Sequence, residues 1–172
     1  DYNKNSEETK LFFAAVQNKL HWAISRQTAA EIICSRADSN KQNMGLTSWK
    51  NSPKGSIRKS DVSIAKNYLN EEELNILNRI VSLYLDYAEL QANNRKIMHM
   101  NDWIKKLDSF LRFNEKEILA NPGKVGAEIA KSFAEAEFEK YSVIQDRFYE
   151  SDFDKEIKKL THEGGKNNTR SA

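Results

Sequence analysis

The sequence predicts an all-α protein, a single multi-helix domain of about seven helices with one irregular basic loop insert in its first third. Apolar residues recur at helical spacing along most of the chain. Residues that suit helix N-caps precede several of these segments. The insert, residues 36–67, differs from its flanks because it holds three of the six glycines and prolines that precede the C-terminal tail, Gly45, Pro53 and Gly55.

The first two helices follow from caps and spacing. A first helix is predicted to begin at Ser6, with two glutamates in its first turn, and to end near Ser25 or Arg26. Its apolar stripe consists of Phe13, Val16, Leu20 and Ile24. Thr28 and Glu31 have capping-box spacing, which predicts a short second helix.

Irregular structure is expected in the basic insert. Residues 46–49 suit a short strand or an extended loop, and the Ser-Pro-Lys-Gly segment at 52–55 suits a turn. Ser60 or Asp61 is then expected to cap a short helix. The apolar residues of that helix are Val62, Ile64, Ala65 and Leu69.

The helix that follows Asn70 has the clearest pattern. Asn70 and Glu73 form another capping box, and the helix is predicted to run to about Arg95. One apolar stripe consists of Leu74, Leu77, Val81, Tyr84 and Ala88, and a second consists of Ile76, Ile80, Leu83, Tyr87 and Leu90. So wide an apolar arc predicts a central helix that is buried on more than one side.

Three further helices are predicted. Asn101 is expected to cap one that carries Ile104, Leu107, Leu111 and Ile118. Asn-Pro-Gly at 121–123 breaks the chain. A long helix is then expected from about 124 to 149, with Ile129, Phe133, Ala136 and Val143 on one side. A short helix to about residue 160 completes the domain (residues 1–160), and residues 161–172 are expected to be a disordered tail.

Composition narrows the class of protein. No run of about 18 apolar residues exists, so no membrane partner is expected, and residues 1–10 do not form a secretory signal. The chain begins with Asp, which suggests a piece of a longer protein. Cys34 is the single cysteine, which excludes an intrachain disulfide and favours the cytoplasm. A small buried apolar residue is the ordinary role of such a cysteine.

Charge is concentrated in the insert. The whole chain has a net charge of +2, whereas seven Lys and Arg against two Asp give the insert +5. Cations, amides and hydroxyls on a loop suit an anionic partner, DNA or RNA above all. The candidate binding residues are His21, Arg36, Asp38, Asn43, Gly45, Thr47, Trp49, Arg58, Lys59, Asp61, Lys66 and Asn67.

Several of these residues also have ordinary structural explanations. Arg36 and Asp38 suit a local ion pair or cap, and Trp49 suits burial beneath the loop as well as base stacking. His21 suits either packing beside Trp22 or a general base. The usual catalytic and nucleotide-binding motifs are absent, and the three histidines lie in separate segments, so no cofactor and no metal are expected.

Many strings in the chain, among them QTAAEII, NMGLTSWK and IRKSDVSIAKNYLNEEEL, closely resemble the C-terminal domain of the RhuM virulence-protein family. The resemblance covers nearly all of residues 10–158. It implies a bacterial protein of pathogenicity islands and other mobile elements, with a DNA-binding-like segment ahead of this domain. The resemblance also covers ten of the candidates named above, namely His21, Arg36, Asp38, Asn43, Gly45, Thr47, Lys59, Asp61, Lys66 and Asn67. This chain departs from the family pattern at Cys34, Gln42 and Ile97.

Three hypotheses stay open from the sequence. The first is a virulence-associated binding module that contacts nucleic acid or another anionic partner through residues 36–67. The second is a toxin- or nuclease-type enzyme that acts on phosphate-containing substrates at the same loop, which requires the polar side chains to converge on one cavity. The third is a domain that mediates homodimer formation.

Overall fold

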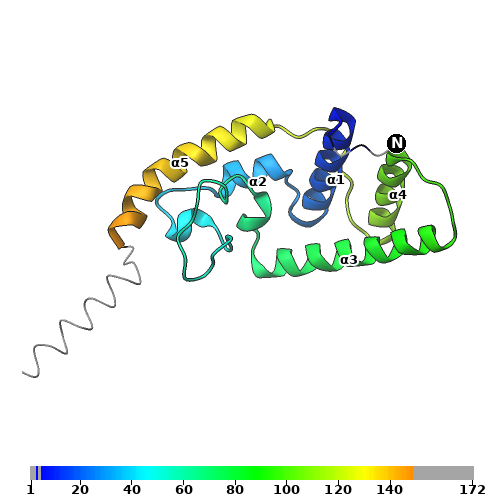
Figure 1. Cartoon of the computed structure of the whole chain (residues 1–172), viewed down its shortest axis with the longest axis horizontal. Coiled ribbons are helices and arrows are strands. Elements are labelled where there is room, and N and C mark those ends of the chain that lie inside the picture. Colours follow the sequence, from blue (N-terminus) through cyan, green and yellow to red (C-terminus); the bar gives the residue numbers. More distant parts are fainter. Residues whose placement is uncertain (1–2, 4, 149–172) are drawn as a thin grey trace, which may run out of the picture.

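The structure, a computed structural model, describes residue 3 and residues 5–148 (Figure 1). Its elements are α1 (Glu7–Ser25), α2 (Ala29–Arg36), η1 (Gln42–Gly45), η2 (Ala65–Tyr68), α3 (Glu71–Asn93), α4 (Met100–Phe113) and α5 (Ala127–Phe148). The described residues thus form five α-helices, two single-turn 3-10 helices and no strand. The all-α class is confirmed, and the described residues contain five α-helices rather than about seven.

Local signals located the helix starts well. The Ser6 hydroxyl accepts a hydrogen bond from the Thr9 amide at 3.2 Å, and both predicted capping boxes form, at Thr28 and at Asn70. The N-cap of α4 is His99 rather than Asn101, and α4 ends at Phe113, before Ile118.

Two predicted helices need comment. The short helix expected from residue 60 is a series of turns followed by the 3-10 helix η2. Since Asp61 uses its carboxylate to bind loop amides, it does not cap a helix. The last predicted helix, to residue 160, and the tail lie outside the described residues. Residues 46–49 form an extended loop and not a strand.

Two groups of buried side chains form the core. In the first, α2 and α5 pack together over the insert, which contributes Met44, Val62 and Tyr68. In the second, Ala23 of α1 and Ile80 of α3 meet residues of α4. Figure 1 shows α3 running along one edge of the molecule, with α5 along the other side and the insert at the end where α3 begins. The insert is therefore part of the core and not an appendage.

The burial of α3 is narrower than predicted. Only Leu77 and Ile80 of α3 are buried, whereas Leu83, Leu85 and Leu90 are 44%, 62% and 55% exposed. The second apolar stripe is therefore covered only in part, since Leu83 and Leu90 are exposed while the Tyr87 ring contacts Trp103 of α4. None of the helices in the described part of the chain has the length and apolar character needed to cross a membrane.

The apolar side that the sequence marks on α5 faces outward. Ile129 and Val143 are 67% and 54% exposed, whereas Ala130 and Ala134 are fully buried against the first core. Alanine lets two helix backbones approach closely, and α2 packs on this face of α5. Sequence spacing identified the stripe but not the direction in which it points.

The chain reverses direction at η1 through three residues with left-handed backbone. Asn43, Met44 and Gly45 have φ values of 52°, 57° and 82°. The reversal places the Met44 side chain in the core, where it is fully buried. A Cβ on Gly45 would lie 2.2 Å from the carbonyl oxygen of Arg36, closer than any real contact. Glycine is thus required at position 45.

We predict that Gly45→Ala lowers the free energy of unfolding by more than about 2 kcal/mol, because the added methyl collides with backbone and the left-handed conformation disfavours a side chain. Gly126→Ala is the matched control, since its Cβ would meet nothing closer than 4.0 Å. Urea unfolding followed by circular dichroism measures both variants. Equal stability of the two would contradict the assigned role of Gly45.

Candidate functional site

A buried aspartate organises the basic insert. Asp61 is only 3% exposed, and its carboxylate accepts hydrogen bonds from the amides of Lys50, at 3.3 Å, and Arg58, at 2.9 Å. The Asn67 side-chain amide donates to the Asp61 carbonyl oxygen at 2.9 Å. One residue therefore joins three separate stretches of the insert. Asp61 and Asn67 therefore stabilise the insert through hydrogen bonds within it.

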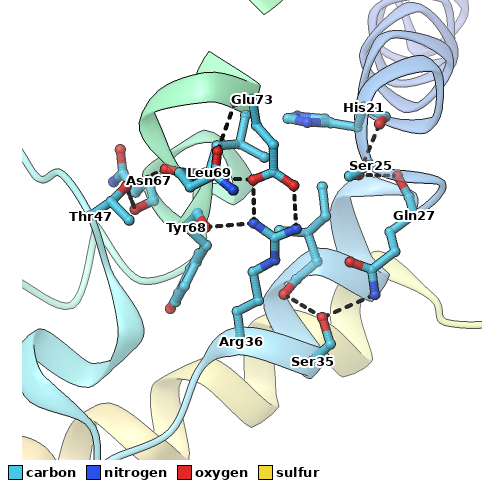
Figure 2. Close-up of polar contacts among 12 residues, drawn as sticks. His21, Ser25, Gln27, Ser35, Arg36, Thr47, Asn67, Tyr68, Leu69 and Glu73 are labelled. Atoms are coloured by element: carbon cyan, nitrogen blue, oxygen red, sulfur yellow. Dashed lines mark hydrogen bonds and ion pairs between the residues drawn. The ribbon is translucent and has the colours of Figure 1, made fainter. Parts of the chain in front are cut away.

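A second set of bonds joins residue 47 to the end of the insert. The Thr47 amide donates to the Asn67 carbonyl at 2.8 Å, and the Thr47 hydroxyl donates to the Leu69 carbonyl at 2.5 Å (Figure 2). Tyr68 is only 1% exposed, and its hydroxyl donates to the Val62 carbonyl at 2.8 Å. These bonds satisfy polar groups that the fold buries, so Thr47 also has a structural role.

Three contacts attach the insert to α5. Glu137 accepts a hydrogen bond from the Ser39 amide at 2.7 Å, and Gln145 bonds both the amide and the carbonyl of Ile57. Lys59 lies 3.3 Å from a Glu135 oxygen. The hydrogen bond from Lys140, with that from Ser39, lowers the pKa of Glu137 to about 2. The Lys59 ammonium is therefore paired with glutamates of α5.

Arg36 forms a two-pronged ion pair with Glu73. Its two terminal nitrogens lie 2.6 and 2.7 Å from the two carboxylate oxygens, and one also donates to the Tyr68 carbonyl at 2.9 Å (Figure 2). The Glu73 carboxylate also accepts the Asn70 amide, so it caps α3 as well. The bonds from Arg36 lower the pKa of the Glu73 carboxyl, and the carboxylate raises the pKa of Arg36.

His21 lies beside this ion pair. Figure 2 shows its ring extending from α1 toward the first turn of α3, which carries Glu73. The residue is 8% exposed, and its Nδ1 atom is buried with no hydrogen-bond partner among the described residues. Burial, and secondarily the charge of Arg36, lower the pKa of the imidazole below 6.5. His21 is therefore neutral at neutral pH.

The remaining candidates lie apart from His21. Asp38 accepts both the amide and the side chain of Asn40 in a tight turn. Trp49 is half-buried, donates from Nε1 to the Gly55 carbonyl at 2.6 Å, and lines a cavity of about 210 Å³ that also contacts Asn43. Gly45 has the backbone role described above.

The structure sorts the cations of the insert into two groups. Arg36, Lys41 and Lys59 contact carboxylates. The exposed cations without an ion pair to any described residue are Lys50, Lys54, Arg58 and Lys66. For the second group, no described carboxylate competes with an external anion.

The candidate residues do not share one cavity. His21 and Lys66 line one cavity, Asn43 and Trp49 line another, and Thr47, Asp61 and Asn67 brace the loop. The pairing of Glu73 with Arg36 was not predicted, although the capping box identified Glu73 as a helix-start residue. Ser63 and Asn78, which line the cavity beside His21, were not among the predicted site residues either. No pattern links those two residues to His21, because they are distant in sequence.

Metal binding and cysteine-based catalysis lack support in the described part of the chain. No group of three or more His, Cys, Asp or Glu side chains is arranged to hold a metal ion among the described residues. Burial raises the pKa of the Cys34 thiol, which disfavours the reactive thiolate.

Fold and site thus define an all-helical protein with a folded basic insert. The chain belongs to the RhuM virulence protein family, whose family model matches residues 1–150. No match was found among curated proteins or among solved structures.

We predict that Arg36→Met lowers the free energy of unfolding by about 3 kcal/mol, because Glu73 is left as a half-buried, unpaired carboxylate. The double variant Arg36→Met/Glu73→Leu is expected to lose less than the sum of the two single changes, with a coupling of about 1–3 kcal/mol. Urea unfolding of all four proteins measures this coupling.

The exposed pair Glu7 and Lys10 supplies the control for this cycle. Its coupling is expected to stay below about 0.5 kcal/mol, as for other surface pairs on one helix. A coupling of that size for Arg36 and Glu73 would show that their pair contributes no more than a surface contact.

We predict that acidification from about pH 7 to about pH 5 destabilises the protein through His21. In the unfolded chain His21 takes up a proton near pH 6.5, whereas in the folded protein its imidazole stays neutral to a lower pH. The contribution of His21 to stability is therefore complete above pH 6.5 and is lost as the pH falls toward the lower pKa of the folded state. Urea midpoints across this range should fall more in the wild type than in His21→Asn. Parallel pH profiles would contradict this.

Proposed function

We propose that this chain is a binding module for nucleic acid and that the exposed cations of the basic insert contact phosphates. These cations are Lys50, Lys54, Arg58 and Lys66. One observation carries the proposal: all four remain exposed and have no ion pair to a described residue, although the backbone beneath them is tightly hydrogen-bonded. Exposed cations on an ordered loop suit a partner that presents several phosphates.

The backbone supports the proposal because it fixes the positions from which the cationic side chains extend. The amides of Lys50 and Arg58 bind one carboxylate, that of Asp61. Asn67, next to Lys66, bonds to the same residue. The Cα atoms of three cations are therefore held in a single unit before any ligand binds. Such preorganisation reduces the entropy that binding must otherwise overcome.

Trp49 adds a contact suited to a base. Its ring is half-buried and lines the cavity of about 210 Å³ that Lys54 also contacts. An aromatic ring beside a cation matches the alternation of base and phosphate in a single strand. We therefore expect single strands to bind as well as duplexes.

The enzyme hypothesis has weaker support. Phosphoryl transfer needs an acid or base and cations around one reacting centre. Of the residues considered for that role, His21 and Lys66 line the same cavity, while Arg36 pairs with Glu73 and Lys59 pairs with α5. The geometry thus favours binding over catalysis.

The same proposal includes the setting that the resemblance implies, the C-terminal part of a longer DNA-associated protein that acts in the bacterial cytoplasm. Self-association is a separate prediction. The mass of the protein in solution, measured by light scattering over a range of concentrations, distinguishes a homodimer from a monomer.

The proposed contacts predict a salt dependence. Four phosphate contacts give a log–log slope of affinity against salt of about −3.6 on duplex DNA and about −2.8 on a single strand. Replacement of Lys50, Lys54, Arg58 and Lys66 by Gln should weaken binding and bring the slope close to zero. Fluorescence anisotropy with labelled duplex and single-stranded oligonucleotides measures both quantities.

A matched control removes the same number and type of charges elsewhere. The control set is three lysines and one arginine, all exposed, in the loop after α3 and on α4: Lys96, Lys105, Lys106 and Arg112. Their replacement by Gln should leave the slope unchanged. An equal loss of affinity in both variants would show that net charge alone causes the effect. Absence of salt-dependent binding in the wild type would exclude the proposed function.

A further inference from the structure

A cavity of about 490 Å³ lies where α1, α3 and the end of the insert meet. Leu20, Leu77 and Val81 give it an apolar wall, and His21, Lys66 and Asn78 give it a polar one. Its volume falls in the range of small-molecule sites, and a mainly apolar wall with a few polar groups is typical of them. No carboxylate lines it among the described residues.

His21 is the feature of this cavity that most needs explanation. Its Nδ1 atom is buried and bonds to nothing among the described residues. A buried N–H without an acceptor is costlier than a buried lone pair, so the single proton of the neutral ring belongs on Nε2. The Nε2 atom also has no hydrogen bond to a described residue. Since His21 lines the cavity, a ligand there could supply the acceptor that this ring lacks.

Lys66 gives the cavity its charge. Its backbone is fixed in η2, its side chain is exposed, and it has no ion pair to a described residue. The nearby Arg36 and Glu73 neutralise each other. The side chains of Asn78, Gln17 and Ser63, which can all donate hydrogen bonds, complete the polar wall. A ligand that fits must accept hydrogen bonds and carry negative charge.

We infer that this cavity binds a small organic anion, a carboxylate or phosphate monoester with an apolar body. The anionic group would meet the Lys66 ammonium and accept from His21 Nε2, while the apolar body would lie against Leu20, Leu77 and Val81. This site is separate from the proposed nucleic-acid surface except for Lys66, and it does not depend on that proposal. A ligand here would contact α1, α3 and the insert together.

The test uses the protein in solution and four probes: benzoate, phenyl phosphate, benzyl alcohol and inorganic phosphate. The readout is the set of histidine ring signals in NMR spectra, with the His21 signal assigned from its loss in His21→Asn. Benzoate or phenyl phosphate should shift the His21 signal saturably, with a Kd of about 1 mM or below. Benzyl alcohol lacks the charge and inorganic phosphate lacks the apolar body, so both should bind at least about tenfold more weakly.

Variants distinguish a site from non-specific charge. Lys66→Gln should weaken benzoate about tenfold. Asn78→Asp adds a carboxylate at an exposed position of the wall and should abolish binding. Asn75→Asp makes the same change on the exposed surface of α3, outside the cavity, and should have no effect. Both Asn variants keep the side-chain shape, so loss of folding does not explain a difference between them.

The outcomes separate this inference from the proposed function. Lys50→Gln should weaken oligonucleotide binding and leave benzoate binding unchanged, whereas Asn78→Asp should have its main effect on benzoate. The inference is overturned if no probe shifts the His21 signal saturably at about 10 mM. It is also overturned if Asn75→Asp weakens binding as much as Asn78→Asp does.

Discussion

The ion pair between Arg36 and Glu73 is the contact on which the arrangement of this protein most depends. Arg36 is the last residue of α2, and Glu73 lies in the first turn of α3, 37 residues later. The whole basic insert lies between them. Because Arg36 also binds the Tyr68 carbonyl and Glu73 also caps α3, one contact fixes the end of one helix, the start of another and the final turn of the insert.

A bidentate pair suits this position better than a simple charge contact. The two parallel hydrogen bonds fix orientation as well as distance, which a lysine does not achieve. The pair is half-buried, so removal of one partner costs more than the pair itself contributes. We attribute to this geometry the ability of a polar, glycine-containing insert to keep one conformation. The pair also lies beside His21, where Arg36 lowers the pKa of the imidazole and Glu73 raises it, while burial is the larger cause of the lowered pKa.

Some polar residues of the insert bond within the protein, and others remain exposed to solvent. The side chains of Asp61, Thr47 and Asn67 bond to backbone groups within the protein. Lys59 faces the carboxylates of α5. Three of the exposed cations without an ion pair to a described residue, Lys50, Arg58 and Lys66, lie on the backbone that the contacts of Asp61 hold in place. A loop of this kind presents charge on a rigid support, which explains why its local charge of +5 overstates the number of cations that an external partner meets.

Local chemistry in the sequence determined the all-α class, the starts of α1, α2 and α3, the turn at 52–55 and the location of the insert, because caps and turns involve residues only a few positions apart. Tertiary structure alone decided the rest. The partner of Arg36 is 37 residues away, and the direction of the α5 stripe depends on whether alanines or larger residues meet α2. The grouping of His21, Lys66 and Asn78 around one cavity likewise arises from three separate segments. Spacing shows which residues share a helix face, whereas only packing selects the face that is buried and the charges that are left unpaired.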